Sequence, residues 1–309
     1  MESVSGGFRR HSRPAFAAIA VAVGSFVALP SVAEVVRIDI EIRDAVAGGK
    51  SYGLAGAYER LAGRIHYAVD PVNAANRVIG DIDYAPKNSN GEVEFSADFY
   101  LLKPVDADAG NGTVLVDVMN RGRKRILGYF NRTDAVLEPV TEADLGDGFL
   151  MHEGFSVLYV GWQFDVPRQP GFLRVYPPIA TNGGEPLEGL VRSDFVVTEP
   201  TYDYSLGDRG HIPYAVADPE DPRNRLAVRD TPAGERTVIA RDRWQFGRLV
   251  DGRMVGDPTR IYLTTGFEPS RIYEAVFVAS DPPIAGLGLA AMRDTVSHLK
   301  YDAAEALGF

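Results

Sequence analysis

The chain has 309 residues, of which 45% are hydrophobic and 24% are charged, and it contains no cysteine. These proportions exclude collagen-like and disordered proteins, and the lack of cysteine excludes disulfides, cysteine-bound zinc or iron–sulfur centres and thiol catalysis. The formal net charge of −10 makes the chain a poor electrostatic partner for nucleic acid or anionic lipid. We therefore expect no nucleic-acid partner and no membrane association beyond the N-terminal segment described next.

Residues 1–33 have the three-part pattern of a secretory signal peptide. Three arginines within 9–13 precede an uncharged apolar stretch over 15–29, and the small residues Ser31 and Ala33 occupy the −3 and −1 positions of a cleavage site. The apolar stretch is shorter than the roughly 20 residues that span a bilayer. We predict cleavage after Ala33 and a periplasmic or secreted protein, with a retained N-terminal anchor as the alternative.

Two kinds of strand are predicted in the first half of the remaining chain. Apolar and charged residues alternate over 36–43, and the segment 92–104 shows a similar alternation, typical of a strand with one solvent-facing side. The segments 113–119 and 155–160 are instead almost continuously apolar, as in strands that are buried on both faces of a parallel sheet. A helix over 141–153 would connect these two strands as a βαβ unit, and this predicts an α/β fold.

Residues 164–270 have a different character. They hold most of the prolines, many glycines and only short segments with β-like composition. Pro219 and Pro222 exclude regular structure around them. We expect an insertion of short antiparallel strands and long loops. The β-like segments are 194–198, 236–240 and 260–264.

The clearest helix is predicted near the C-terminal end. Asp281 can cap it, and Pro282 and Pro283 suit a first helical turn. A single apolar stripe then predicts the face that packs on the rest of the protein. The stripe consists of Leu289, Met292, Val296 and Leu299.

Residues 49–53 match two catalytic patterns only in part. They spell the G-x-S-x-G string of a hydrolase nucleophile elbow at Ser51, but the elbow needs a buried strand before the serine and a helix after it, and a loop precedes this one. They also resemble the end of a phosphate-binding loop, but Asp44 stands where the first glycine is required and would repel a phosphate. A glycine-rich turn is the simpler interpretation.

Histidines and carboxylates predict no metal site. The histidines after residue 33 are widely spaced and fit no metal-binding pattern, so we interpret them as surface or packing residues. Asp81 and Asp83 could share a metal ion, but two carboxylates at this spacing are more typical of a solvated strand face or turn. We therefore predict no metal and no cofactor.

A basic loop follows the apolar strand at 113–119. Its residues 121–125 hold four cations. Ligands of α/β sheets bind at the carboxyl ends of such strands, so the loop could bind an anionic substrate. It could equally pair with the excess carboxylates of the chain, and the sequence leaves both interpretations open.

Six segments resemble, in the same order, a family of bacterial proteins described as α/β-hydrolase domain-containing proteins. Many members of this family carry signal peptides, and the similarity extends over roughly residues 35–301. The segments are Ser51–Gly53 with Gly56–Arg60, Val69–Pro71, Val118–Lys124, Gly148–Met151, Val160–Gln163 and Gly286–Asp294.

The resemblance implies a serine hydrolase whose full-length form acts on an ester-like small molecule. In the family the nucleophile elbow follows the helix that corresponds to 285–301, and the acid and the histidine come later still. This sequence ends before all three, so the resemblance implies a truncated protein with no catalytic residue of its own and no activity alone. It leaves one element of the site, the backbone N–H of Asn120 or Arg121 as the first oxyanion-hole donor.

Two hypotheses follow. In the first, residues 34–309 are the N-terminal portion of an exported α/β-hydrolase domain, with an incomplete sheet and with 164–270 as a β-rich insertion. The missing strands would then leave an open sheet edge and exposed apolar surface. In the second, the chain is a complete, exported, β-rich binding or structural domain, because aromatic residues such as those of 164–270 bind sugars or peptides when they lie on β platforms.

Overall fold

The computed structural model describes residues 34–301 together with 307 and 308. The chain divides into two compact units, Met1–Ser31 and Val32–Phe309, and the described residues all belong to the second. The predicted signal peptide at 1–33, with its cleavage site after Ala33, lies outside the described residues.

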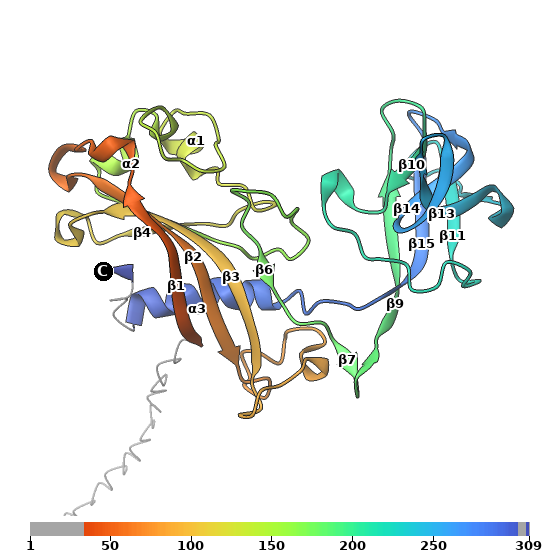
Figure 1. Ribbon diagram of the computed structural model, residues 1–309, viewed down its shortest axis with the longest axis horizontal. Coiled ribbons are helices and arrows are strands. Elements are labelled where there is room, and N and C mark those ends of the chain that lie inside the picture. Colours follow the sequence, from red (N-terminus) through yellow and green to blue (C-terminus); the bar gives the residue numbers. More distant parts are fainter. Residues whose placement is uncertain (1–33, 302–306, 309) are drawn as a thin grey trace, which may run out of the picture. The chain divides into compact units, whose positions relative to one another are not determined.

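A six-stranded sheet forms the first part of the second unit (Figure 1). Its strands follow the order β1-β2-β3-β5-β4, and β6 pairs with β3. The pairs are antiparallel except for β4 and β5, which run parallel. The strands are β1 (Val35–Ala45), β2 (Tyr58–Val69), β3 (Val93–Pro104), β4 (Val114–Asp117), β5 (Ser156–Val160) and β6 (Val175–Tyr176).

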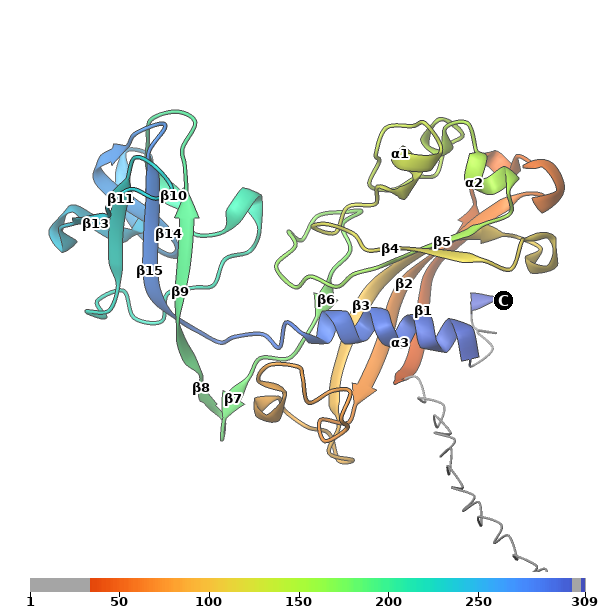
Figure 2. The ribbon, with the colours of Figure 1, turned by 180° about the vertical axis from the view of Figure 1, so that it is seen from behind.

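The inner strands β3 and β5 are buried on both faces, and their successive side chains enter two different cores. On β3, Phe99 and Leu101 enter one core, while Tyr100 and Leu102 enter the other. The first core is closed by α3 (Leu287–Tyr301), which runs across this face of the sheet in Figure 2. The second core is covered by two short helices, α1 (Ile126–Phe130) and α2 (Phe149–His152).

Residues 188–280 form two further antiparallel sheets that share one core. One sheet has the order β12-β11-β15-β9, and the other has the order β10-β14-β13. Aromatic rings fill the space between them, with Trp244 against Phe246 at 5.4 Å and Phe267 against Tyr273 at 4.8 Å between ring centroids. The strands are β9 (Glu188–Phe195), β10 (Thr201–Ser205), β11 (Arg225–Arg229), β12 (Thr237–Ile239), β13 (Trp244–Val250), β14 (Arg253–Phe267) and β15 (Ile272–Ser280).

Short elements connect these parts. A hairpin whose strands have two residues each, β7 (Thr181–Asn182) and β8 (Glu185–Pro186), precedes β9. Single-turn 3₁₀ helices occur in the loops of the described chain. They are η1 (Ala47–Gly49), η2 (Gly53–Ala55), η3 (Ile82–Tyr84), η4 (Ala107–Ala109), η5 (Ala143–Leu145), η6 (Asp208–Gly210) and η7 (Arg241–Arg243).

The predicted fold class was wrong. The described residues are 41% strand and 17% helix, and they form several antiparallel sheets rather than an α/β-hydrolase-like layout. A parallel pair was correctly expected from 113–119 and 155–160, but no crossover helix forms over 141–153. Gly146 and Gly148 have φ of 61° and 69° there, and a side chain at Gly146 would lie 2.0 Å from the Asn131 carbonyl oxygen. These two left-handed residues confine α2 to a single turn.

The terminal helix forms, but it packs through a different face from the one predicted. Its buried residues include Leu287, Gly288 and Ala291, whereas Leu289 is 61% exposed. Small side chains let the helix approach the sheet closely, since a Cβ at Gly288 would lie 1.7 Å from the Trp162 carbonyl oxygen. The apolar stripe centred on Leu289 is therefore partly on the solvent side.

One edge of the first sheet carries apolar side chains that are incompletely buried, and the expectation of a truncated sheet stays a prediction. Strand β4 lies at the end of the strand order, and its side chains are only half-buried. Val118, just beyond it, is exposed, as is Val296 of α3. Among residues 34–301, 307 and 308, no helix has the length and apolar character needed to cross a bilayer.

Candidate ligand-binding cavity

A cavity of about 360 Å³ lies where the loop after β5 meets β9 and the segment 206–214. Its wall combines polar groups with three aromatic rings, as is usual for small-molecule sites. The rings are those of Phe164, Tyr214 and Phe277, and the other polar side chains belong to Arg121, Gln163, Asp165, Arg192, Ser193, Asp194 and His211.

The central polar contact of the cavity joins Asp165 and His211. The Asp165 Oδ2 atom lies 2.7 Å from His211 Nδ1, and the backbone N–H of Ile212 donates to the Asp165 carbonyl oxygen at 2.7 Å. His211 is only 8% exposed. A carboxylate oxygen accepts in such a contact, so Nδ1 is the donor, and Nε2 is the ring nitrogen that this contact leaves for a ligand.

A close backbone approach sets the position of His211. A Cβ at Gly207 would lie 2.3 Å from the His211 carbonyl oxygen, so no other residue fits there without displacing the segment. The N–H of Gly207 donates to Ser205 Oγ at 3.1 Å, and this contact begins the turn that contains η6. The turn returns the chain to Asp165.

Buried polar groups fix the loop that carries Gln163 and Asp165. The guanidinium of Arg174 donates to the carbonyl oxygens of Phe164 and Val166, and the backbone N–H of Arg174 donates to Asp98 on β3 at 3.1 Å. Burial raises the pKa of Asp98, although its hydrogen bonds oppose the shift. The loop is thereby tied to the middle strand of the first sheet.

The predicted oxyanion residues lie directly after β4. Arg121 lines the cavity with φ of 59°, and its backbone N–H donates to Gln163 Oε1 at 2.5 Å. Nearby, the indole N–H of Trp162 donates to the carbonyl oxygen of Met119. The N–H of Arg121 thus already has an acceptor in this structure, and a role of Asn120 or Arg121 in an oxyanion hole stays a prediction.

Two of the three aromatic rings that line the cavity, those of Phe164 and Tyr214, lie close to each other. Their ring centroids are 5.8 Å apart, and the planes are inclined at 55°. Burial, followed by the charges of Asp165 and Asp81, raises the pKa of Tyr214, so its hydroxyl keeps its proton at neutral pH. The cavity therefore offers apolar ring surface beside a set of hydrogen-bonding groups.

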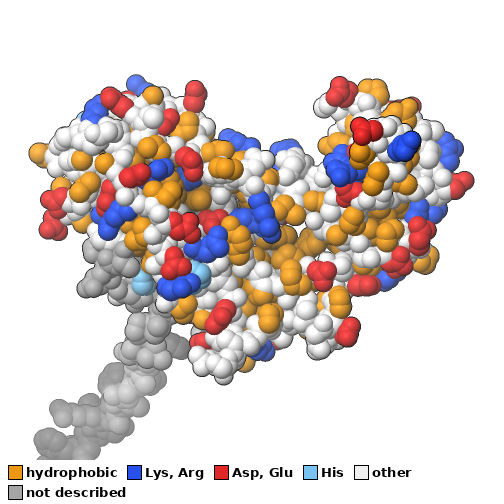
Figure 3. All heavy atoms as spheres, viewed as in Figure 1, with side chains coloured by type: hydrophobic (Ala, Val, Ile, Leu, Met, Phe, Trp, Pro, Cys, Tyr) orange, Lys and Arg blue, Asp and Glu red, His pale blue; other side chains and the backbone are white. Residues whose placement is uncertain are grey.

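The charges around the cavity are balanced. Arg121 and Arg192 contribute two positive charges, and Asp165 and Asp194 contribute two negative ones. Arg192 contacts Asp194 at 3.3 Å. On the face drawn in Figure 3, acidic and basic side chains are likewise intermixed rather than gathered by sign. Neither a strong anion nor a strong cation is favoured by such a lining.

The basic loop at 121–125 serves two different purposes. Lys124 is buried, and its ammonium donates to the carbonyl oxygens of Leu137 and Gly171 at 2.6 and 2.8 Å. Burial lowers the pKa of Lys124 to about 8. Arg121 lines the cavity instead, so the loop is neither a uniform anion site nor a purely solvated one.

The other residues singled out from the sequence lie apart from the cavity. Ser51 is exposed in a turn and forms a β-bridge with Ala57, in agreement with the glycine-rich turn. Asp81 and Asp83 are both exposed, and the described residues contain no group of three side chains that could hold a metal ion. On the first sheet, His66 Nε2 lies within hydrogen-bond distance of Asp39 Oδ2, at 2.9 Å.

Sequence reasoning missed the central pair of the cavity. Asp165 and His211 are 46 positions apart, and nothing in the spacing of the histidines distinguished His211 from the others. Gln163 stood inside a segment used for the family resemblance but was given no role. Comparison with protein families, with curated proteins and with solved structures finds no match for this chain.

Proposed function

We propose that the chain is an exported binding protein for a small, uncharged, hydroxyl-rich molecule of the size of a mono- or disaccharide. The observation that carries this proposal is the Asp165–His211 pair, which faces the same cavity as the rings of Phe164 and Tyr214. Export rests on the pattern of residues 1–33.

The lining supports a hydroxylated ligand for two reasons. A hydroxyl group both donates and accepts, and the lining combines the carboxylates of Asp165 and Asp194 with the imidazole of His211 and the amide of Gln163. The apolar faces of a sugar ring pack on aromatic side chains, and the balanced charges of the lining penalise ligands with a net charge. The volume of about 360 Å³ lies at the small end of the range typical for ligand cavities.

Ester hydrolysis by this chain is not part of the proposal. The serine hydrolase implied by the resemblance needs the α/β-hydrolase layout, which the antiparallel sheets contradict. Among the described residues, no hydroxyl group is hydrogen-bonded to His211, so the pair with Asp165 lacks the nucleophile of a triad. We expect no ester turnover and no labelling by a serine-reactive fluorophosphonate, and robust labelling would overturn this part.

Ligand-dependent thermal unfolding tests the binding. The purified chain is heated with glucose, galactose, mannose, arabinose and their disaccharides at millimolar concentration. A ligand at 100 times its Kd stabilises the folded state by about 2.7 kcal/mol, which is a clear shift in melting temperature. We expect at least one sugar to raise the melting temperature of wild type but not that of His211→Ala. His66→Ala is the control, because His66 contacts Asp39 on the first sheet, and its melting temperature should rise as that of wild type does. No shift with any sugar, or an equal shift in His211→Ala, would overturn the proposal.

A further inference from the structure

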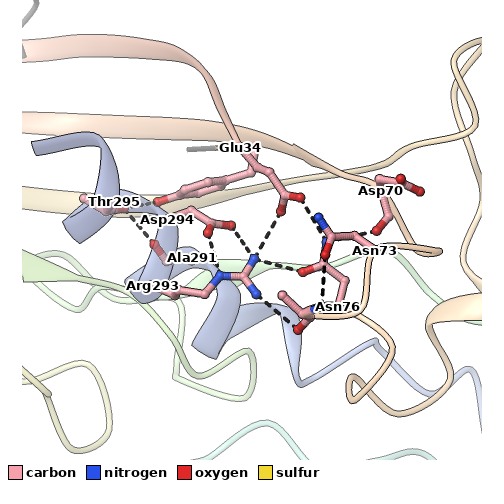
Figure 4. A network of polar contacts seen from close by, with 10 residues as sticks. Glu34, Asp70, Asn73, Asn76, Ala291, Arg293, Asp294 and Thr295 are labelled. Atoms are coloured by element: carbon pink, nitrogen blue, oxygen red, sulfur yellow. Dashed lines mark hydrogen bonds and ion pairs between the residues drawn. The ribbon is translucent and has the colours of Figure 1, made fainter. Parts of the chain in front are cut away.

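A partly buried polar cluster surrounds Glu34, the residue that follows the predicted cleavage site (Figure 4). Glu34 Oε2 lies 3.1 Å from Arg293 Nη2 on α3, and Glu34 Oε1 accepts from Asn76 Nδ2 at 2.9 Å. Arg293 also pairs with Asp294 at 2.6 Å and donates to Asn76 Oδ1 at 2.9 Å. The cluster therefore joins the beginning of β1, the turn after β2 and the terminal helix.

The charges of this cluster do not balance. Two carboxylates, of Glu34 and Asp294, share the single guanidinium of Arg293. Asp294 is only 2% exposed, and Asn76 is fully buried and uncharged. Burial, opposed by the Asn76 hydrogen bond and reinforced by the Asp294 charge, raises the pKa of Glu34 to about 7. The second carboxylate has no cation of its own among the described residues, and near neutral pH the Glu34 carboxyl group is therefore partly protonated.

The remaining groups around the cluster add no positive charge. On the turn, Asp70 accepts the second Asn76 amide hydrogen bond through its carbonyl oxygen. On the helix side, the hydroxyls of Tyr67 and Thr295 bond to each other at 2.7 Å. Desolvated carboxylates are stabilised chiefly by a nearby cation, so a second positive charge would be favourable here.

We propose that the cluster is completed by the α-ammonium group of Glu34, which is created when the chain is cleaved after Ala33. The step is hydrolysis by an endopeptidase: water adds across the Ala33–Glu34 amide, its hydroxyl goes to the Ala33 carbonyl carbon, and the nitrogen of Glu34 becomes an amine that takes up a proton. The inference rests on the cleavage predicted from the sequence and is independent of the sugar site.

The position of residue 34 supports this assignment. The Glu34 side chain is held by Arg293 and Asn76, and its carbonyl oxygen accepts the backbone N–H of Ala68 at 3.0 Å. The amine that cleavage creates belongs to the same residue as one of the two carboxylates, so it lies only a few bonds from the Glu34 carboxyl group. Its positive charge would offset the excess negative charge of the cluster, and removal of the leader should therefore stabilise the fold.

The test compares two forms of the chain that begins at Glu34, one with a free amine and one acetylated at the same nitrogen. We expect the acetylated form to unfold at lower denaturant concentration at pH 7, and the amine pKa, measured by NMR titration, to exceed its ordinary value of about 8. A cation whose pKa is raised on folding stabilises below its unfolded pKa, and this contribution is lost as pH rises through the folded pKa. The difference between the two forms should therefore vanish in alkaline solution.

Three variants locate the effect. Asp294→Asn and Glu34→Ala each remove the excess negative charge, so the difference between free and acetylated forms should shrink several-fold in both. Glu41→Gln removes an exposed carboxylate of β1 outside the cluster and should leave the difference unchanged. Equal unfolding midpoints of the free and acetylated wild-type forms, or an amine pKa at or below its ordinary value, would overturn the proposal.

Discussion

The first sheet and the two sheets of residues 188–280 are stabilised in different ways. Lys124 and Asp294 are buried beside the first sheet, and Asp98 of β3 is largely buried. The later sheets enclose mainly aromatic and aliphatic side chains, although they also bury an ion pair between Arg229 and Glu274. Because polar contacts are directional, those of the first region fix loop positions, whereas aromatic and aliphatic packing fills most of the core between the later sheets.

The largest expected effect is in the aromatic core. Trp244→Ala should lower the free energy of unfolding by about 3–5 kcal/mol, because it leaves a large void between the sheets. Trp244→Phe keeps a ring in place and removes an indole N–H that has no hydrogen-bond partner among the described atoms, so it should cost less. Urea denaturation measures both, and equal losses would contradict a packing origin.

A pH-dependent effect should distinguish the first region. The lowered pKa of Lys124, about 8, means that the unfolded chain binds more protons than the folded chain between that value and its ordinary 10.5. As pH rises over this range, the free energy of unfolding of wild type should therefore increase by about 3 kcal/mol relative to that of Lys124→Met. The exposed Lys87→Met serves as control and should follow wild type. Parallel stability curves for wild type and Lys124→Met would refute the buried charge.

The shape of the cavity depends on the close approach of the backbone at Gly207 to the His211 carbonyl oxygen. Gly207→Ala should cost about 1–3 kcal/mol and abolish sugar-dependent thermal shifts, because its Cβ would displace the His211 carbonyl. Gly189→Ala is the matched control, since a Cβ there has no neighbour within 4 Å. If Gly207→Ala bound sugar as well as Gly189→Ala does, His211 could not be a contact of the ligand.

The smallest expected effect concerns the two faces of α3. Leu289→Gln lies on the exposed face and should change the free energy of unfolding by less than about 0.5 kcal/mol. Ala291→Gln on the buried face should destabilise far more, because a long side chain overpacks the contact with the sheet. Comparable losses in the two variants would mean that the apolar stripe, not the small-residue face, packs inward.

Local patterns predicted strands better than they predicted architecture. Alternation over 36–43 and 92–104 corresponds to β1 and β3, and two of the three β-like segments of 164–270 correspond to β12 and part of β14. The fold class failed because one parallel pair was extended to a whole parallel sheet, although a single pair constrains only its own neighbours. Whether 164–270 is an insertion in a larger domain stays a prediction.

The cavity could not be predicted from local sequence patterns either, because its residues are brought together by tertiary contacts. The contact between Asp165 and His211 depends on the turn at Gly207 and on the anchoring of the loop by Arg174, and neither leaves a periodic signal in the sequence. The face of α3 was misassigned because hydrophobicity was weighted above size. Gly288 and Ala291 are poor hydrophobic anchors, but both are buried, and the lack of a side chain at Gly288 allows the close contact with the Trp162 carbonyl oxygen.

The bond between Tyr67 and Thr295 joins residues 228 positions apart, and it lies in the core that α3 closes. During synthesis, the first sheet cannot bury this face until the final described helix has left the ribosome. The strands of residues 188–280 pair only with one another, so they can complete their core earlier. The middle of the chain is thus free to fold first, and the sheet at the beginning must wait for the helix at the end.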